Sequence, residues 1–399
     1  MGIPRVLHVI RPAAGGMLTH LELLLKGLGQ AGYDLTAACP VEELVLQRLR
    51  AAGVTRILPL DVGDTLRPWL DPLIIGKFSS FLKEHPFDVI HAHGAKAGLI
   101  TRLALNWRGR LPYPVIVSYH NEILPESRSS RQRRVRYLAE KYLAKYTSHF
   151  IAVSPGIKDE LINVIGCPPG QVSLIPNGIE LAESENGEKN GEIRRVYRSM
   201  WGWSDDVHTF VVGTACRLMW EKGPDLLLEA ARLALEEEPS LRFVIIGDGP
   251  MADELRQTAE AYGLIPFVRF LGYQDNARRI FPAFDAFVLL SRTEGWPLSI
   301  MEAMAAGLPV VATGTGGPAY MIKSGRTGIL VSPGDVRKPA EALILLARDR
   351  AWAKELGRAA ADYVRRHCSA ETMVTQVETV YHQLLQGTQA AAFLGKGED

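Results

Sequence analysis

The sequence predicts an α/β protein made of two doubly wound, Rossmann-like domains, each with a parallel sheet covered by helices. Short runs of β-branched and apolar residues alternate with longer segments of helical spacing along the whole chain. The strand runs are continuously apolar rather than alternating, as in parallel sheets that are buried on both faces. The chain has 399 residues, which suits two hydrophobic cores better than one.

Thirteen runs are predicted as strands, seven in the first half of the chain and six in the second. In the first half they are Val6–Ile10, Asp34–Cys39, Arg56–Leu60, Val89–Ala92, Val115–Tyr119, Phe150–Val153 and Val172–Pro176. In the second half they are Thr209–Cys216, Arg242–Gly247, Val268–Gly272, Ala286–Ser291, Val310–Thr313 and Gly328–Val331. Helical spacing marks the segments between them, among them Met17–Ala31, Asp225–Glu237 and Met251–Tyr262.

The boundary between the two halves is predicted from a polar stretch, ELAESENGEKNGE, at residues 180–192. Its near lack of apolar side chains is typical of an inter-domain linker. We therefore expect an N-terminal domain at 1–180, a linker at 181–192 and a C-terminal domain at 193–369. Because open parallel sheets bind ligands beyond the carboxyl ends of their strands, functional residues are expected in the strand-to-helix loops.

Composition and charge exclude several classes of protein. The formal net charge is +1, so charge favours no nucleic-acid partner. The four cysteines lie far apart, with no pair or cluster at zinc spacing, which is typical of a reduced intracellular protein. No signal peptide and no apolar run of transmembrane length is evident. The expected location is the cytoplasm.

Two loops carry groups suited to bind phosphate. Gly15 and Gly16 follow the first strand, where glycine lets the backbone approach an anion at a helix N-terminus, although a simple tight turn explains them equally well. Arg217 and Lys222 follow the first strand of the second half. Both are cations that can neutralise a diphosphate, and the alternative is a solvated pair on the surface.

The most informative loop is EGWPLSIMEAMAAG, which follows the strand ending near Ser291. Glu294 and Gly295 lie in the loop, whereas Glu302 lies one turn into a short helix. Glu294 is placed to contact sugar hydroxyls and Glu302 to accept both hydroxyls of a ribose. Free N–H groups near Leu298 and Ser299 can meet phosphate oxygens. The two carboxylates are not placed to straddle one bond, as those of a glycoside hydrolase are.

Histidines end two strands of the first half. His93 and His120 are candidates to contact a transferred sugar or an acceptor, against the commoner structural role of a lone histidine. His91 and His93 share one face of a strand, which suggests a metal pair. No third ligand is apparent in the sequence, so no metal site is predicted.

These residues resemble glycosyltransferase family 4, the retaining enzymes of the two-domain GT-B fold, over essentially the whole chain. The resemblance rests on Glu294-x7-Glu302, and on motifs in the same order as in the family. These motifs are IPNGIE, GTACRLMWEKG, GDGP and FLG. The chain departs from the family at Cys216, at Trp296 and after the Gly-Gly of residues 316–317, where Pro-Ala-Tyr replaces a segment that often carries a carboxylate.

The resemblance implies a role for each position. Gly16 would offer a backbone N–H to the diphosphate or sugar, and Arg217 and Lys222 would hold the diphosphate. Glu294 would contact the donor sugar and Glu302 the ribose. His120 matches the histidine that the family has near the donor sugar and the acceptor. Helices at 370–399 would cross back onto the N-terminal domain.

The predicted activity is that of a retaining hexosyltransferase with no cofactor, using a nucleoside-diphosphate sugar as donor. The expected donor is a UDP-sugar rather than a GDP-sugar. The chain contains no Asp-x-Asp, so Arg217, Lys222 and a helix N-terminus are expected to replace a metal ion on the diphosphate. The alternatives are a sugar-nucleotide epimerase of the same architecture and a non-catalytic relative that binds nucleotide sugars.

The acceptor is expected to be a glycan or lipid-linked precursor of the cell envelope. Residues 128–146 hold seven Arg or Lys and one Glu, with Val, Leu and Tyr at helical spacing. Such a helix suits docking on the inner face of an anionic membrane. The alternative is a packed helix with a solvated cationic face.

Overall fold

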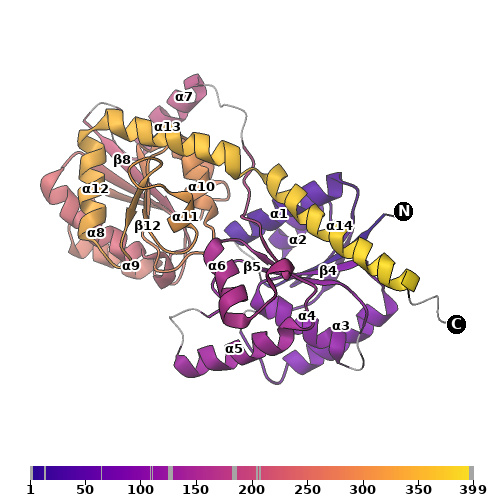
Figure 1. Cartoon of the computed structure of the whole chain (residues 1–399). Coiled ribbons are helices and arrows are strands. Elements are labelled where there is room, and N and C mark those ends of the chain that lie inside the picture. The colour runs from indigo at the N-terminus through magenta and orange to yellow at the C-terminus, as the bar shows by residue number, and fades with distance from the viewer. Residues whose placement is uncertain are drawn as a thin grey trace. The chain divides into compact units, whose positions relative to one another are not determined.

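The structure, a computed structural model, describes residues 3–12, 15–63, 65–107, 109, 111–124, 129–181, 187–203, 205 and 208–394. The chain divides into two compact units. Unit 1 comprises Met1–Gly178 and Ala370–Asp399, and unit 2 comprises Ile179–Ser369 (Figure 1). All thirteen predicted strands are present, and their ends differ from the predicted ones by at most two residues.

The sheet of unit 1 has seven parallel strands in the order β3-β2-β1-β4-β5-β6-β7. The strands are β1 (Arg5–Ile10), β2 (Asp34–Cys39), β3 (Arg56–Pro59), β4 (Val89–His93), β5 (Val115–Tyr119), β6 (His149–Ala152) and β7 (Val172–Leu174). Parallel pairing needs a crossover after each strand, and helices supply most of them. They are α1 (Gly16–Gln30), α2 (Glu43–Ala51), α3 (Asp71–Glu84), α4 (Ala95–Asn106), α5 (Ser130–Ala144) and α6 (Pro155–Asp159).

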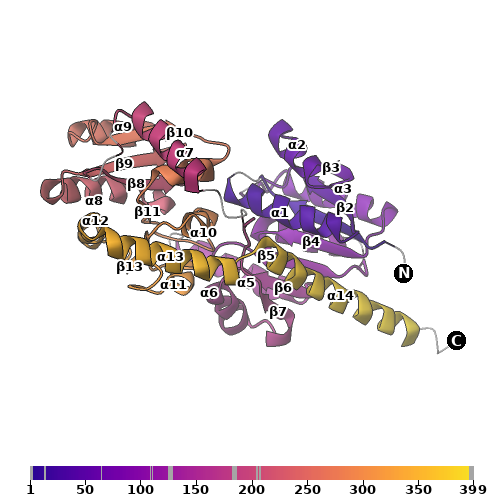
Figure 2. The same cartoon turned by 90° about the horizontal axis from the view of Figure 1, so that it is seen from above.

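The last helix of the chain, α14 (Ala370–Leu394), belongs to unit 1, where it runs alongside α1 (Figure 2). Its apolar residues, Met373 to Tyr381, enter the same core as the inward faces of α1 and β1. Gly27 of α1 allows this approach, because a Cβ there would lie 2.5 Å from a methyl group of Val374. The C-terminal segment is thereby part of the core of unit 1.

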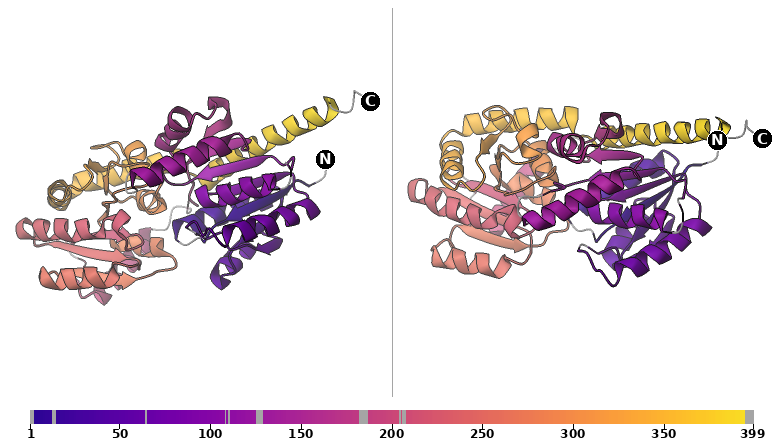
Figure 3. Two further views of the ribbon diagram at one scale, coloured as in Figure 1. Left: turned by 90° about the horizontal axis from the view of Figure 1, so that it is seen from below. Right: turned by 60° about the horizontal axis from the view of Figure 1, so that its bottom comes forward.

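The sheet of unit 2 has six parallel strands in the order β10-β9-β8-β11-β12-β13. The strands are β8 (Phe210–Ala215), β9 (Leu241–Ile246), β10 (Val268–Gly272), β11 (Ala286–Leu289), β12 (Val310–Thr313) and β13 (Ile329–Val331). Helices lie on both faces of each sheet (Figure 3). In unit 2 they are α7 (Gly187–Met200), α8 (Pro224–Glu237), α9 (Ala252–Ala261), α10 (Leu298–Ala305), α11 (Pro318–Met321), α12 (Arg337–Arg348) and α13 (Arg350–His367).

The linker predicted at 181–192 needs correction. Residues 182–186 lie outside the described part of the chain, but α7 begins at Gly187 and belongs to unit 2. Its buried Arg198 donates to the carboxylate of Asp285 (2.6 Å) and to the carbonyl oxygen of Ala283 (2.9 Å). Arg194 donates to the same carboxylate (2.7 Å). These ion pairs attach α7, which includes the last six residues of the predicted linker, to the rest of unit 2.

Both sheets contain a topological switch point, where strand order reverses from one neighbour to the other. It lies between β1 and β4 in unit 1 and between β8 and β11 in unit 2. Ligands of open α/β sheets bind beyond the carboxyl ends of the strands at such points. The loops that follow these four strands contain most of the candidate residues.

Candidate functional site

In unit 2 the switch point brings Lys222 and Glu294 into direct contact. Lys222 ends the loop after β8, and Glu294 lies in the loop after β11. The ammonium group donates to a carboxylate oxygen of Glu294 at 2.7 Å, and Ser291 Oγ donates to the same oxygen at 2.7 Å. The side chain of Glu294 is 4% exposed and that of Lys222 is 28% exposed. The two loops thus share one ion pair.

Lys222 keeps its positive charge although its ammonium group is largely removed from solvent. Burial alone would lower the pKa of Lys222, but the neighbouring carboxylate of Glu294 outweighs this effect and the pKa is raised. The amine therefore stays protonated at neutral pH, and a fixed positive charge faces any anion that enters the loop.

Arg217 and Arg292 differ in their contacts. Arg217 is exposed, and among the described residues its side chain forms no hydrogen bond or ion pair. Arg292 holds both oxygens of Asp225 (2.9 and 2.6 Å), and its guanidinium lies over the ring of Trp220. Sequence reasoning missed the role of Arg292, which ties the β11 loop to the β8 loop. Arg217 is left as the accessible cation of the pair predicted to bind diphosphate.

The N-terminus of α10 presents backbone donors beside this ion pair. The helix begins at Leu298, and no side chain among the residues that the structure describes caps it. The first N–H groups, including those of Leu298 and Ser299, therefore have no partner within the helix. Glu302 lies one turn later and forms no side-chain hydrogen bond or ion pair among the described residues. Burial raises the pKa of Glu302 to about 7, an effect that Arg278 partly opposes.

The loop after β12 packs against the backbone of Glu294 and Gly295. A Cβ at Gly316, which has φ +55°, would lie 1.6 Å from the carbonyl oxygen of Glu294. The N–H of Gly317 donates to the carbonyl oxygen of Gly295 at 2.7 Å. Because only glycine fits this approach, the loop holds the backbone of Glu294 and Gly295 in place.

In unit 1 the predicted glycine pair lies at the end of β1. Gly15 precedes α1 with φ 56°, and Gly16 is the first residue of the helix. No side chain in the described part of the chain caps the N-terminus of α1, so its first N–H groups are available to an anion. Residues 13–14 of the same loop lie outside the described part of the chain.

The predicted histidines lie together, and a third imidazole, that of His8, lies beside His91 and His93. In the register of the parallel sheet, His8 of β1 is paired with His91 of β4. His8 Nδ1 lies 3.0 Å from Nε2 of His93. His120 follows β5 and lies near His20 of α1, with ring centroids 4.7 Å apart. Sequence reasoning missed His8 and His20, because strand register cannot be read from the sequence.

The basic segment folds as the helix α5, with Arg128 outside the described residues. Val135, Leu138 and Tyr142 are 58%, 54% and 57% exposed. Their spacing of three and four residues places them on one face of the helix. Exposed cations flank this apolar stripe, namely Arg131, Arg133, Arg134, Lys141 and Lys145. The stripe does not pack into the core of unit 1.

Among the described residues, no helix has both the length and the apolar character needed to cross a membrane.

Comparisons with family models cover most of the chain. Residues 14–183 match the model described as Glycosyltransferase Family 4, and residues 203–363 match that of Glycosyl transferases group 1. One relative is a UDP-Gal:alpha-D-GlcNAc-diphosphoundecaprenol alpha-1,3-galactosyltransferase of Escherichia coli, 28% identical over 67% of this chain and 68% of that protein. Another is a D-inositol 3-phosphate glycosyltransferase of Actinosynnema mirum, 30% identical over 65% of this chain and 64% of that protein.

Solved structures share the fold at low identity. HepE of Anabaena, in complex with UDP and glucose, matches with a TM-score of 0.79 at 20% identity, over 95% of this chain and 100% of that one. Sucrose-phosphate synthase of Thermosynechococcus elongatus matches with a TM-score of 0.78 at 21% identity, over 96% of this chain and 100% of that one.

Proposed function

Because the chain belongs to glycosyltransferase family 4 and has the GT-B fold, we propose that it is a retaining hexosyltransferase whose donor is a UDP-sugar. The observation that carries this proposal is the Lys222–Glu294 pair at the switch point of unit 2. It places a fixed cation and a buried carboxylate where a nucleotide ligand of this fold would bind. The preference for UDP is supported by the relative named as a UDP-Gal enzyme and by HepE, which was solved with UDP.

The proposed chemistry needs no protein nucleophile. The acceptor hydroxyl attacks the anomeric carbon from the face that the diphosphate leaves. The bond from that carbon to the phosphate oxygen breaks, a bond to the acceptor oxygen forms, and the hydroxyl proton passes to the leaving phosphate. Arg217 holds the diphosphate, and Lys222 and the N-terminus of α10 stabilise the charge that grows as it departs, so this step proceeds without Mg²⁺ or Mn²⁺ on the diphosphate. His120 is assigned to the transferred sugar or the acceptor.

The donor is tested by thermal-shift titration with UDP, GDP and ADP, each with and without common sugars. We expect a stabilising shift with UDP that is weaker in Lys222→Met and unchanged in Lys354→Met, which changes an exposed lysine of α13. A shift with GDP or ADP alone would overturn the donor assignment. No shift with any nucleotide, in folded protein, would overturn the assignment of the site.

The stereochemistry and metal dependence are tested on the reaction product. Proton NMR of the new linkage should show the anomeric configuration of the donor, and inversion would refute the mechanism. Activity in metal-free buffer should not rise when Mg²⁺ or Mn²⁺ is added. A strict requirement for either ion would refute neutralisation by Arg217 and Lys222 alone.

We also propose a lipid-linked acceptor, with α5 docking on an anionic membrane. The exposed stripe of Val135, Leu138 and Tyr142 supports this, as does the relative whose substrate is an undecaprenol-linked sugar. The protein should float with vesicles of anionic lipid at low salt. Leu138→Ser combined with Tyr142→Ser should lose binding, whereas Arg256→Gln on α9 should keep it. No flotation of the unmodified protein at low salt would refute membrane docking.

A further inference from the structure

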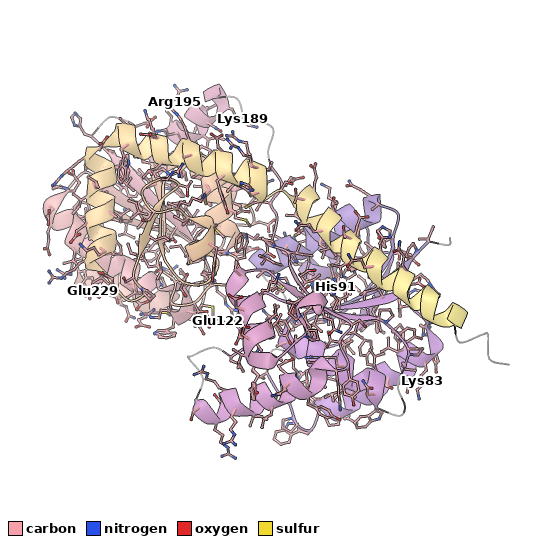
Figure 4. The ribbon with its side chains drawn as sticks, viewed as in Figure 1. Lys83, His91, Glu122, Lys189, Arg195 and Glu229 are labelled. Atoms are coloured by element: carbon pink, nitrogen blue, oxygen red, sulfur yellow. The ribbon has the colours of Figure 1, made fainter. Side chains whose placement is uncertain are left out.

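Five histidines gather on one face of the sheet in unit 1. His8, His91 and His93 come from β1 and β4, His20 comes from α1, and His120 follows β5. Both ring nitrogens of His91, which is labelled in Figure 4, are hydrogen-bonded. Nδ1 bonds to the hydroxyl group of Tyr381 (2.7 Å), and Nε2 bonds to the hydroxyl group of Ser118 (2.6 Å). The proposed transfer reaction assigns a role only to His120. The remaining members need another explanation.

Four of the five have a buried ring nitrogen that no described residue satisfies. These atoms are Nε2 of His8, Nδ1 of His20, Nδ1 of His93 and Nε2 of His120. A buried imidazole nitrogen without a partner is costly, and such an orphan calls for a ligand or an ordered water. Three of these four histidines, His20, His93 and His120, each offer one ring nitrogen to a set in which all three nitrogens lie within 4.8 Å of one another.

This spacing suits a tetrahedral metal ion. Bonds of about 2.0–2.1 Å to zinc place neighbouring ligand nitrogens about 3.4 Å apart, so each ring needs to move by less than about 1 Å. Two of these histidines also have a partner for the other ring nitrogen or the side chain. The Nε2 of His93 lies 3.0 Å from Nδ1 of His8, and Asn177 hydrogen-bonds to the side chain of His120. Metal-bound imidazoles are usually held through their other nitrogen in this way.

A second trio, His8, His91 and His93, also brings three ring nitrogens within 4.8 Å. An ion there would compete with existing hydrogen bonds, because both nitrogens of His91 have partners. Each histidine of the trio His20, His93 and His120 instead has one ring nitrogen without a partner among the described residues. The hydrogen bonds therefore favour the latter trio.

A cationic side chain lies close enough to act on this group of histidines. Arg11 interacts electrostatically with His120 and would oppose a bound cation. Neutral imidazole is the form that binds metal.

We propose that His20, His93 and His120 bind a divalent transition-metal ion of the Zn²⁺ class through three imidazole nitrogens. Imidazole ligands select such ions over Mg²⁺, so the site is separate from the diphosphate chemistry of unit 2. His120 is the least buried of the three, and the fourth coordination position therefore opens on its side, to a water or a ligand oxygen. The ion rather than the ring of His120 would then contact the transferred sugar or the acceptor. Three neutral ligands leave the full charge on the ion, and that position favours an anionic oxygen.

The test is titration of the chelator-treated full-length protein with Co²⁺, which reports four-coordinate binding by its visible absorption. We expect one ion per chain, displaced by Zn²⁺ and not by Mg²⁺. Loss of a group that only hydrogen-bonds to a metal ligand already costs about 10–100-fold in affinity, so loss of a ligand in His20→Gln should cost at least about 100-fold. No nucleotide sugar is present, so the outcome does not depend on the proposed transfer activity.

Two control variants identify the site. His149→Gln removes a buried histidine outside the cluster, bonded to Ser173, and should leave binding unchanged. His91→Gln keeps all three proposed ligands and should bind within about tenfold of the unmodified protein. Thermal unfolding of each metal-free variant checks that it folds. Weak binding by the unmodified protein at several ions per chain, or loss of binding in His91→Gln but not in His20→Gln, would overturn the proposal.

Discussion

Replacing Lys222 by methionine removes one charge from an ion pair whose other member is buried. At an N–O distance of 2.7 Å, the gross attraction is about 6 kcal/mol at an effective dielectric constant of about 20, and desolvation offsets much of it. Breaking a buried pair costs about 3–5 kcal/mol, and the partial exposure of Lys222 places this case near 3 kcal/mol. Loss of a preorganised charge should also raise the activation barrier by about 2–4 kcal/mol, which lowers kcat by about 30- to 1000-fold.

The two effects are separated by measuring kcat and urea unfolding on the same samples. The double variant Lys222→Met with Glu294→Gln leaves no unpaired charge, so its stability should recover by about half or more. Its kcat should stay low, because the cation is still missing. Lys354→Met should match the unmodified protein in both measurements. A kcat for Lys222→Met within about threefold of the unmodified value would refute the role of this cation in the transition state.

Three further predictions concern the neighbourhood of this pair and the anchoring of α5. Because the pKa of Glu302 is about 7, affinity for a UDP-sugar measured by calorimetry should rise between about pH 6 and 8 as the carboxylate forms, and Glu302→Gln should remove the dependence. Gly316→Ala places a Cβ 1.6 Å from a carbonyl oxygen and should lose more than about 2 kcal/mol in urea unfolding; Gly325→Ala, with φ +77° and open space, should lose about 1 kcal/mol. Glu140→Gln removes the charge paired with the fully buried Arg102 and should lower stability by about 3 kcal/mol, and a loss below about 1 kcal/mol would contradict a structural role for the pair.

The strands were predictable because parallel sheets bury both faces. A run such as residues 286–290 has no polar position, and that pattern leaves few alternatives to a central strand. The helix α7 was not predictable in the same way. Its attachment depends on Arg198 and Arg194 reaching Asp285, which lies 87 and 91 residues further along the chain. Composition alone does not distinguish such a polar segment from a linker, because the acidic partner that holds it lies far away in the sequence.

One part of the candidate site was predictable from the sequence, and another part was not. The pairing of Lys222 with Glu294 follows from loops at adjacent carboxyl ends of parallel strands, and the sequence places both residues there. The histidine cluster depends instead on the register of β1 against β4, which pairs His8 with His91 across 83 positions. It also depends on the helical phase that turns His20 toward the sheet. Neither quantity is encoded in a local pattern, so the pair His91 and His93 alone gave no sign of a larger cluster.

The two cations of the β8 loop stabilise different stages of the proposed reaction. Glu294 fixes the ammonium of Lys222 before any ligand binds, so the protein does not reorganise when negative charge grows on the leaving phosphate. Arg217 is exposed, and its side chain must lose freedom to meet a diphosphate in the ground state and the transition state alike. An interaction that is equal in both states strengthens binding without raising kcat. Loss of Arg217 should therefore appear mainly in KM, whereas loss of Lys222 should appear in kcat.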